Sequence, residues 1–215
     1  MVELGSAHLG LLESNSDKAP RHDSFELTKQ LDSTPMKPPT SVHKAINEQI
    51  KNELQAHYNY LGMSAHFEET PYLGFAKWMR AQATEEHVHA MKLFDFLRER
   101  NVSIELGAID APKTKYGPGP LEVFEVALAQ EQGVTRQIND LYELALKEKD
   151  YSTLPFLMWF LQEQVEEENT VLDIIDRLSL AGDNAAGLLR LDHEAATQAA
   201  MGGGPPAKSP GYQPA

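Results

Sequence analysis

The sequence of 215 residues contains no cysteine. This absence excludes disulfide bonds, thiolate metal sites and cysteine nucleophiles, and it suits a reducing compartment. Positive charge is scarce too, because 19 Lys and Arg residues stand against 32 Asp and Glu, giving a formal net charge of −13. A surface this acidic disfavours nucleic acid and anionic membranes as partners, and it attracts cations.

The chain also lacks long apolar runs, and none approaches the length of a membrane span. Its first thirty or so residues show no basic segment followed by an apolar one, and they carry Glu3, Glu13 and Asp17. These features disfavour a secretory signal and an organelle transit peptide. We therefore expect a cytoplasmic protein that does not bind membranes.

Composition divides the chain into three parts. Residues 1–39 mix Ser, Asp, Lys and Pro, which predicts a mostly disordered N-terminal arm. Residues 199–215 are rich in Gly and Pro and predict a flexible tail. Residues 40–198 between them predict one helical domain.

Within that domain, apolar residues recur every three or four positions in four long segments and one short one. We expect helices from Ser41 as N-cap to about 69, from Pro71 to about 100, from just after Pro120 to about 149, from 152 to 181, and from 184 to 198. Gly182 is expected to cap the end of the fourth helix.

The connections predict how these helices are arranged. Short links join helices one and two, and helices three and four, so each pair should be antiparallel. About eighteen residues separate helices two and three. A link of that length can run along the whole bundle, so we predict an all-α four-helix bundle with one long crossover and a short fifth helix.

Acidic side chains interrupt the apolar stripe of every long helix near its middle. A step of seven residues returns to nearly the same helix face, and Glu131 lies seven after Phe124 and seven before Ile138. The interrupting residues are Glu53, Glu86 with His89, Glu131, and Gln164 with Glu167.

Burying these carboxylates would cost several kcal/mol each without a compensating partner. A pair of metal ions would compensate them, since carboxylates from four helices with one Glu-x-x-His motif are the ligands of di-iron bundles, and this donor set suits iron or manganese. The alternative is a hydrogen-bonded polar network without metal.

A second acidic group surrounds Glu167 on the fourth helix. Glu163 and Glu166 flank the interior positions, and Glu85 could meet them across the bundle. This group is either a solvated acidic face or a third, all-carboxylate metal site.

At these positions the sequence resembles the non-haem ferritins of bacteria. The segments that carry the resemblance are NEQIKNEL (47–54), EEHVHAMKLFDFL (85–97), EQGVTRQIN (131–139) and LMWFLQEQVEEE (157–168). The resemblance covers about residues 41–195, which makes 40–198 a ferritin-like domain.

The resemblance implies roles for individual residues. Glu53, Glu86 and His89 match the first iron site. Glu86, Glu131 and Glu167 match the second, with Glu86 bridging both irons. Glu85, Glu163, Glu166 and Glu167 match a third site. Gln164 matches a hydrogen-bonding glutamine beside the second iron, and Tyr60 and Trp159 match aromatic residues that either donate electrons or serve as core aromatics.

The resemblance also implies a ferroxidase that oxidises Fe(II) with O2 and stores the ferric product inside a shell of twenty-four subunits. His87 stands where bacterioferritins carry a haem-binding methionine, so no haem is expected. The fourth helix lacks a second Glu-x-x-His motif. Two other readings remain open: a di-iron oxidase or peroxide-reducing enzyme without storage, and a non-catalytic binding protein. His57, one turn from Glu53, is either a partner of the metal ligands or a surface histidine.

Overall fold

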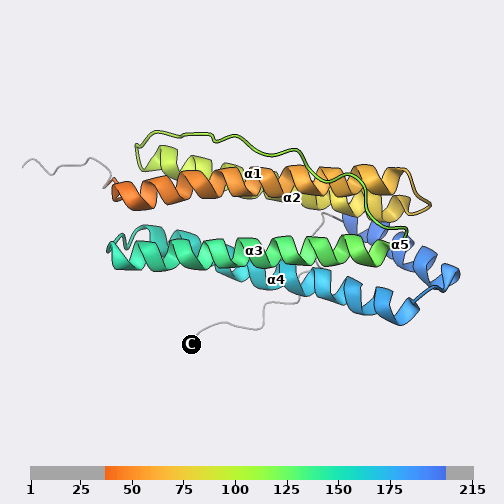
Figure 1. The fold of residues 1–215 in the computed structure, drawn as a ribbon. Helices are drawn as coiled ribbons and strands as arrows, with labels where there is room; N and C mark the ends of the chain where they lie inside the picture. The colour runs from red at the N-terminus through yellow and green to blue at the C-terminus, as the bar shows by residue number, and fades with distance from the viewer. Residues whose placement is uncertain (1–36, 202–215) are drawn as a thin grey trace, which may run out of the picture. The chain divides into compact units, whose positions relative to one another are not determined.

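The structure is a computed structural model that describes residues 37–201. The predicted arm and tail lie almost entirely outside these residues, so the domain boundaries stay predictions. Within the described part the chain forms helices and no strand (Figure 1). The helices are α1 (Thr40–Glu68), α2 (Leu73–Glu99), α3 (Pro120–Lys147), α4 (Thr153–Ala181) and α5 (Ala185–Ala200).

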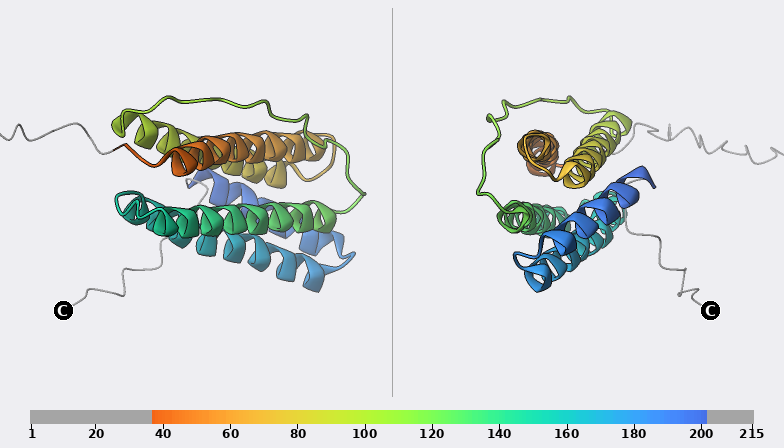
Figure 2. Two further views of the ribbon diagram at one scale, coloured as in Figure 1. Left: turned by 60° about the vertical axis from the view of Figure 1, so that its left-hand side comes forward. Right: turned by 90° about the vertical axis from the view of Figure 1, so that its right-hand side faces the viewer.

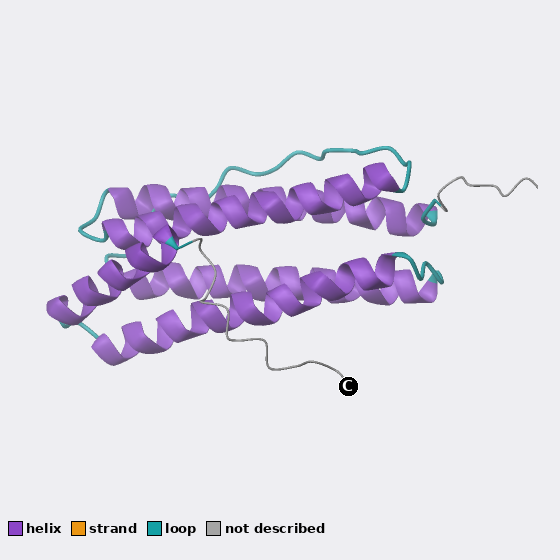
Figure 3. Cartoon of the chain, turned by 180° about the vertical axis from the view of Figure 1, so that it is seen from behind, coloured by secondary structure: helices purple, strands orange, loops and turns teal. Residues whose placement is uncertain are grey.

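The four long helices form two antiparallel pairs, as the link lengths predicted. α1 lies beside α2, and α3 lies beside α4 (Figures 1 and 2). The crossover between α2 and α3 runs along the outside of the first pair. Helix α5 packs across the bundle end where α2 begins (Figure 3). The predicted all-α bundle with a short fifth helix is confirmed. None of the described helices is long and apolar enough to cross a membrane.

Two predicted helix starts were wrong, and one predicted end is confirmed. Helix α1 begins at Thr40, so Ser41 lies within its first turn, and the residue before the helix makes no side-chain cap bond. Helix α2 begins at Leu73, two residues after Pro71. Gly182 ends α4 with φ of +51°, a backbone conformation that favours glycine.

Hydrogen bonds anchor the crossover to α1. His43 Nε2 donates to the carbonyl of Ser103 at 2.5 Å. One turn and three turns further along α1, side-chain amides pair with crossover backbone: Asn47 accepts from the Glu105 N–H, and Gln55 both accepts from and donates to the backbone of Asp110. These contacts satisfy backbone groups of a segment without secondary structure.

The interior is divided into two apolar clusters. Near the α5 end, the cluster takes residues 60–67 of α1, 75–83 of α2, 123–127 of α3 and 171–178 of α4. The second cluster, at the other end, contains buried side chains from residues 42–50, 93–97, 134–145 and 157–160 of the same helices. On every helix the interrupting polar residues fall between these two sets. The structure thus places one polar layer between two apolar blocks.

A buried ionic cluster joins the ends of α2 and α3. Arg100 donates to Asp150 Oδ1 at 2.9 Å and to the hydroxyl of Thr153 at 3.0 Å. Thr153 in turn donates to Asp150 Oδ2 at 2.7 Å. This closed set of hydrogen bonds fixes the turn between α3 and α4 against α2.

Helix α5 approaches the start of α2 at a glycine. Asp192 of α5 accepts a hydrogen bond from the Phe75 N–H at 2.7 Å, which satisfies one of the free donors of the first turn of α2. A Cβ atom placed on Gly74 would lie 1.8 Å from the Asp192 carbonyl oxygen. The close contact between the two backbones therefore requires glycine at position 74.

Substitution of Gly74 tests this contact. We expect Gly74→Ala to destabilise the fold by about 1–3 kcal/mol or more, because backbone rather than a flexible side chain must move. Urea unfolding followed by circular dichroism measures the change. Gly133→Ala is the matched control, since its Cβ would meet only the end of Arg136 at 3.9 Å and should gain about 0.5–1 kcal/mol in helix propensity. Equal effects at the two glycines would contradict the assignment.

Candidate metal centre

The polar layer is as buried as the apolar blocks around it. Every interior position predicted from the helix stripes has at most 6% of its surface exposed. These residues are Glu53 of α1, Glu86 and His89 of α2, Glu131 of α3, and Gln164 and Glu167 of α4. The helical period alone therefore predicted correctly that these six side chains are buried.

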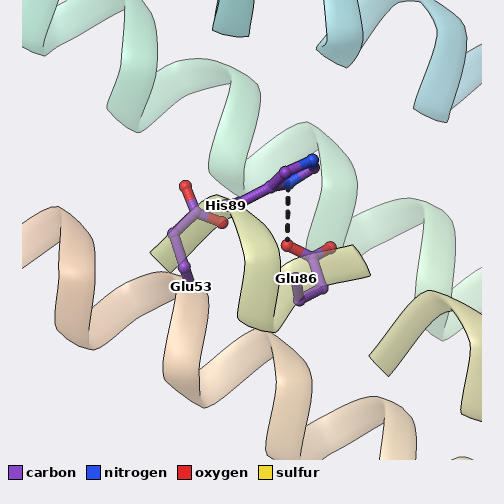
Figure 4. A group of neighbouring side chains, drawn as sticks. All are labelled: Glu53, Glu86 and His89. Carbon is purple, nitrogen blue, oxygen red and sulfur yellow. Dashed lines mark ion pairs between the residues drawn. The ribbon is translucent and has the colours of Figure 1, made fainter. Parts of the chain in front are cut away.

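Glu53, Glu86 and His89 form one close group (Figure 4). One ligand atom from each residue lies within 4.8 Å of the other two. Glu86 Oε2 lies 3.4 Å from His89 Nδ1, which is longer than a good hydrogen bond. Oε2 of Glu53 and Oε2 of Glu86 are both buried without a hydrogen-bond partner among the described residues. Such oxygens are costly to bury unless a cation binds them.

Burial sets the charge state of this group. It raises the pKa of Glu53 from 4.5 to about 7. The pKa of Glu86 is raised well above its ordinary value, first by burial and then by repulsion from Glu131, Glu53 and Glu167. The pKa of His89 is lowered to about 4, first by burial and then by the positive charge of Lys92. At neutral pH the imidazole is therefore uncharged, which is the form that binds metal.

Glu131 is held by two neutral donors. The hydroxyl of Tyr60 donates to Glu131 Oε1 at 2.5 Å. Gln164 Nε2 lies 3.5 Å from Glu131 Oε2 and 3.3 Å from its backbone carbonyl. These bonds lower the pKa of Glu131, but burial outweighs them, and the pKa remains raised.

Two further buried residues, both glutamines that the helix stripes did not single out, donate hydrogen bonds to the carboxylates of the site. Gln49 donates to Glu53 Oε1 at 2.9 Å. Gln82 donates to both Glu85 and Glu167, at 3.2 Å each. Each glutamine lies four residues before a layer glutamate and therefore shares that residue's helix face. This spacing could have predicted from the sequence that both glutamines face the interior.

The second and third predicted ligand sets are assembled differently. Among the described residues, Glu86, Glu131 and Glu167 do not form a group as close as the first. Repulsion from Glu131 nevertheless helps to raise the pKa values of both Glu86 and Glu167. Glu85 and Glu167 instead form a close group with His89. Glu163 is half-buried and Glu166 is exposed. The assignments of these two sets stay predictions.

Trp159 lies beside the first group. Its ring meets that of His89 edge-on, with ring centres 5.4 Å apart, and the Lys92 ammonium sits 3.9 Å above the indole. Both aromatic residues therefore contact a predicted iron ligand, Trp159 through the ring of His89 and Tyr60 through its hydrogen bond to Glu131.

The donor set decides what the layer can bind. Carboxylate oxygens from four helices with a single imidazole suit Fe and Mn better than metals that prefer sulfur. A divalent ion would also offset the burial cost of carboxylates that otherwise hold protons up to neutral pH. The residues present thus fit one or more such ions.

Comparisons with known proteins agree with this chemistry. Residues 43–181 match the family model of the ferritin-like domain. The bacterial non-heme ferritin of Staphylococcus haemolyticus is 42% identical over 155 residues, covering 72% of this chain and 93% of the relative. The bacterial non-heme ferritin of Staphylococcus aureus strain USA300 is 38% identical over 151 residues, covering 70% and 90%.

Solved structures of an archaeal ferritin also match this chain. The open pore ferritin of Archaeoglobus fulgidus matches with a TM-score of 0.72 and 41% identity, covering 74% of this chain and 96% of its own. A form of that ferritin engineered to be closed matches with the same TM-score and coverage at 42% identity.

The raised carboxyl pKa values predict how stability depends on pH in metal-free protein. Between pH 4.5 and about 7, folded Glu53 holds a proton that the unfolded chain releases, so its contribution is complete below pH 4.5 and lost as the pH rises through 7. His89 makes stability rise with pH between about pH 4 and 6.5, because its pKa is lowered in the folded state. The raised pKa values of several carboxyls outweigh this single group. We expect stability to fall from pH 5 to pH 8, by up to about 1.4 kcal/mol per pH unit for each net proton released.

Urea unfolding of chelator-treated protein at several pH values measures this slope. Glu53→Gln should flatten it, whereas Glu143→Gln, on the exposed face of α3, should not. Adding a divalent metal should weaken or reverse the slope, because metal binds the deprotonated carboxylates. Stability that rises with pH in the metal-free protein would contradict the burial argument.

Proposed function

We infer the function from the family match over residues 43–181, by which this chain belongs to the ferritin family. Its function is iron storage, coupled to oxidation of Fe(II). The observation that carries this conclusion is the buried layer in which Glu53, Glu86 and His89 converge between two apolar blocks. Relatives named bacterial non-heme ferritin, at 38–42% identity, support it.

We assign the oxidation step to two Fe(II) ions bound in this layer. Glu53, Glu86 and His89 hold the first ion, and Glu86, Glu131 and Glu167 hold the second. Glu86 bridges the two, which is supported by its contact with Glu53 and His89 and by the repulsion that Glu131 and Glu167 exert on it. Each Fe(II) gives one electron to O2, and carboxylate ligands favour the higher charge of the ferric products.

Neighbouring residues position these ligands. Gln49 orients Glu53, while Tyr60 and Gln164 orient Glu131. Tyr60 also places an oxidisable phenol against a carboxylate that can accept its proton. Glu85, Glu163 and Glu166 then form a third site with Glu167, through which ferric iron leaves the centre. Gln82, which donates hydrogen bonds to both Glu85 and Glu167, supports the grouping of these two carboxylates.

Storage requires an enclosed space that one bundle does not provide. We propose that copies of this chain assemble into a shell of twenty-four subunits that collects ferric oxo-hydroxide, as its family membership implies. Exposed apolar side chains such as Leu180, Leu189 and Val165 offer surface for such assembly. A cytoplasmic location stays a prediction.

A di-iron oxidase or peroxide-reducing enzyme without storage is the remaining alternative. The family match and the relatives do not favour it. The ligands also differ from a set with a second Glu-x-x-His motif, because α4 directs Gln164 and Glu167 to the interior and contains no histidine.

Glu86→Ala tests the bridging assignment. The substitution removes a ligand from both irons, so we expect rapid oxidation of two Fe(II) per chain to fall to the rate of iron in buffer. Stopped-flow absorbance of ferric species in air measures this rate. Glu143→Ala, an exposed carboxylate on α3, should oxidise iron like the unmodified protein. Rapid oxidation that survives in Glu86→Ala would rule out a bridging role.

Storage is tested by adding Fe(II) in air in large excess over protein chains, followed by size exclusion with iron detection. We expect soluble ferric iron to elute with a very large particle, far beyond two irons per chain. Iron that is oxidised and then lost, or a small particle holding about two irons per chain, would point to the enzyme without storage.

A further inference from the structure

Two histidines meet outside the carboxylate layer, where the proposed ferroxidase chemistry does not use them. His57 lies in the middle of α1 and is half-buried, while His87 lies in the middle of α2 and is exposed. Their ring centres are 5.8 Å apart, with an angle of 60° between the ring planes. Because α1 and α2 pack side by side (Figures 1 and 2), the pair stands on two rigid elements.

A hydrogen bond fixes the ring of His57. Its Nδ1 lies 2.6 Å from the backbone carbonyl oxygen of Ala83 on α2. A carbonyl oxygen only accepts, so Nδ1 carries the proton, and Nε2 of the neutral ring keeps its lone pair. Metal-binding histidines typically donate their other N–H to a backbone carbonyl or a carboxylate in this way.

The same carbonyl places the second ring. In an α-helix the Ala83 oxygen also faces the N–H four residues later, which belongs to His87. His57 is thus anchored at the turn that carries His87. With Zn–N bonds of about 2.0–2.1 Å, two imidazoles on one ion have centres roughly 5–6 Å apart. The observed separation lies in that range, and the exposed His87 ring can turn its nitrogen inward.

We propose that His57 and His87 together bind a divalent cation of the zinc, copper or nickel class at the seam between α1 and α2. Imidazole nitrogens favour these ions, whereas carboxylate oxygens suit iron and manganese. The acidic chain attracts cations of either kind. Two protein ligands leave further coordination positions for water, so this site is weaker than a four-ligand structural zinc site.

Crystals of the full chain soaked in Zn²⁺ test the proposal directly. Anomalous diffraction at the zinc edge should show an ion between His57 and His87, separate from any ion in the carboxylate layer. A parallel Mn²⁺ soak should fill the layer and leave the histidine pair empty. Equal occupancy of the pair by both metals would contradict the assigned metal class.

His57→Asn is the sharpest variant, because the asparagine amide can still donate to the Ala83 carbonyl while Nε2 is lost. We expect it to remove the zinc ion at the pair, with affinity reduced at least about tenfold in equilibrium dialysis. His87→Gln should act likewise. His193→Ala, an exposed histidine on α5, is the matched control and should keep the ion.

The ions of the carboxylate layer serve as an internal control for folding, since they should stay in place in every variant. No zinc at the pair in the unmodified protein, or zinc that persists in His57→Asn, would overturn the proposal. An ion held by His87 residues of two chains without His57 would overturn it as well.

Discussion

Four glutamates buried close together cannot all be ionised in a metal-free bundle, and the rest of the molecule is arranged around that constraint. Burial raises the pKa values of Glu53, Glu86, Glu131 and Glu167, and repulsion from neighbouring carboxylates adds to this effect, so the layer holds protons where exposed carboxylates would not. Cations can replace those protons. Binding of a cation therefore releases protons from the layer. Iron binding is favourable because it offsets the free energy that burying these carboxylates costs.

Because burying the polar layer is unfavourable, other contacts must stabilise the fold. The apolar blocks on either side supply that stability, and both draw on all four long helices. Contacts at the ends keep the helices in register: Arg100 with Asp150 at one end, and Asp192 against Gly74 at the other. A shift of one helix by a single residue would turn its glutamate about 100° away from the centre.

Helix periodicity predicted the bundle and the six layer residues, because burial follows the apolar stripe and the stripe has a fixed period. It did not predict which atoms approach one another. Side-chain length and rotamer decide that Glu85 meets Gln82 and Glu167 while Glu166 stays exposed. Helix starts failed at Ser41 and Pro71 because several neighbouring residues there can begin a helix, and the tertiary contacts choose between them.

Glu86 and His87 show how adjacent residues acquire different chemistry. One step along an α-helix turns the side chain by about 100°, so Glu86 faces the layer while His87 faces the seam with α1. The interior position combines carboxylates, which stabilise ferric charge, and the seam position combines imidazoles, which prefer zinc-like ions. Separate sites on one helix pair would keep such ions away from the ligands that oxidation needs. Metal choice in this protein then depends on which helix face a ligand occupies as much as on which ligand it is.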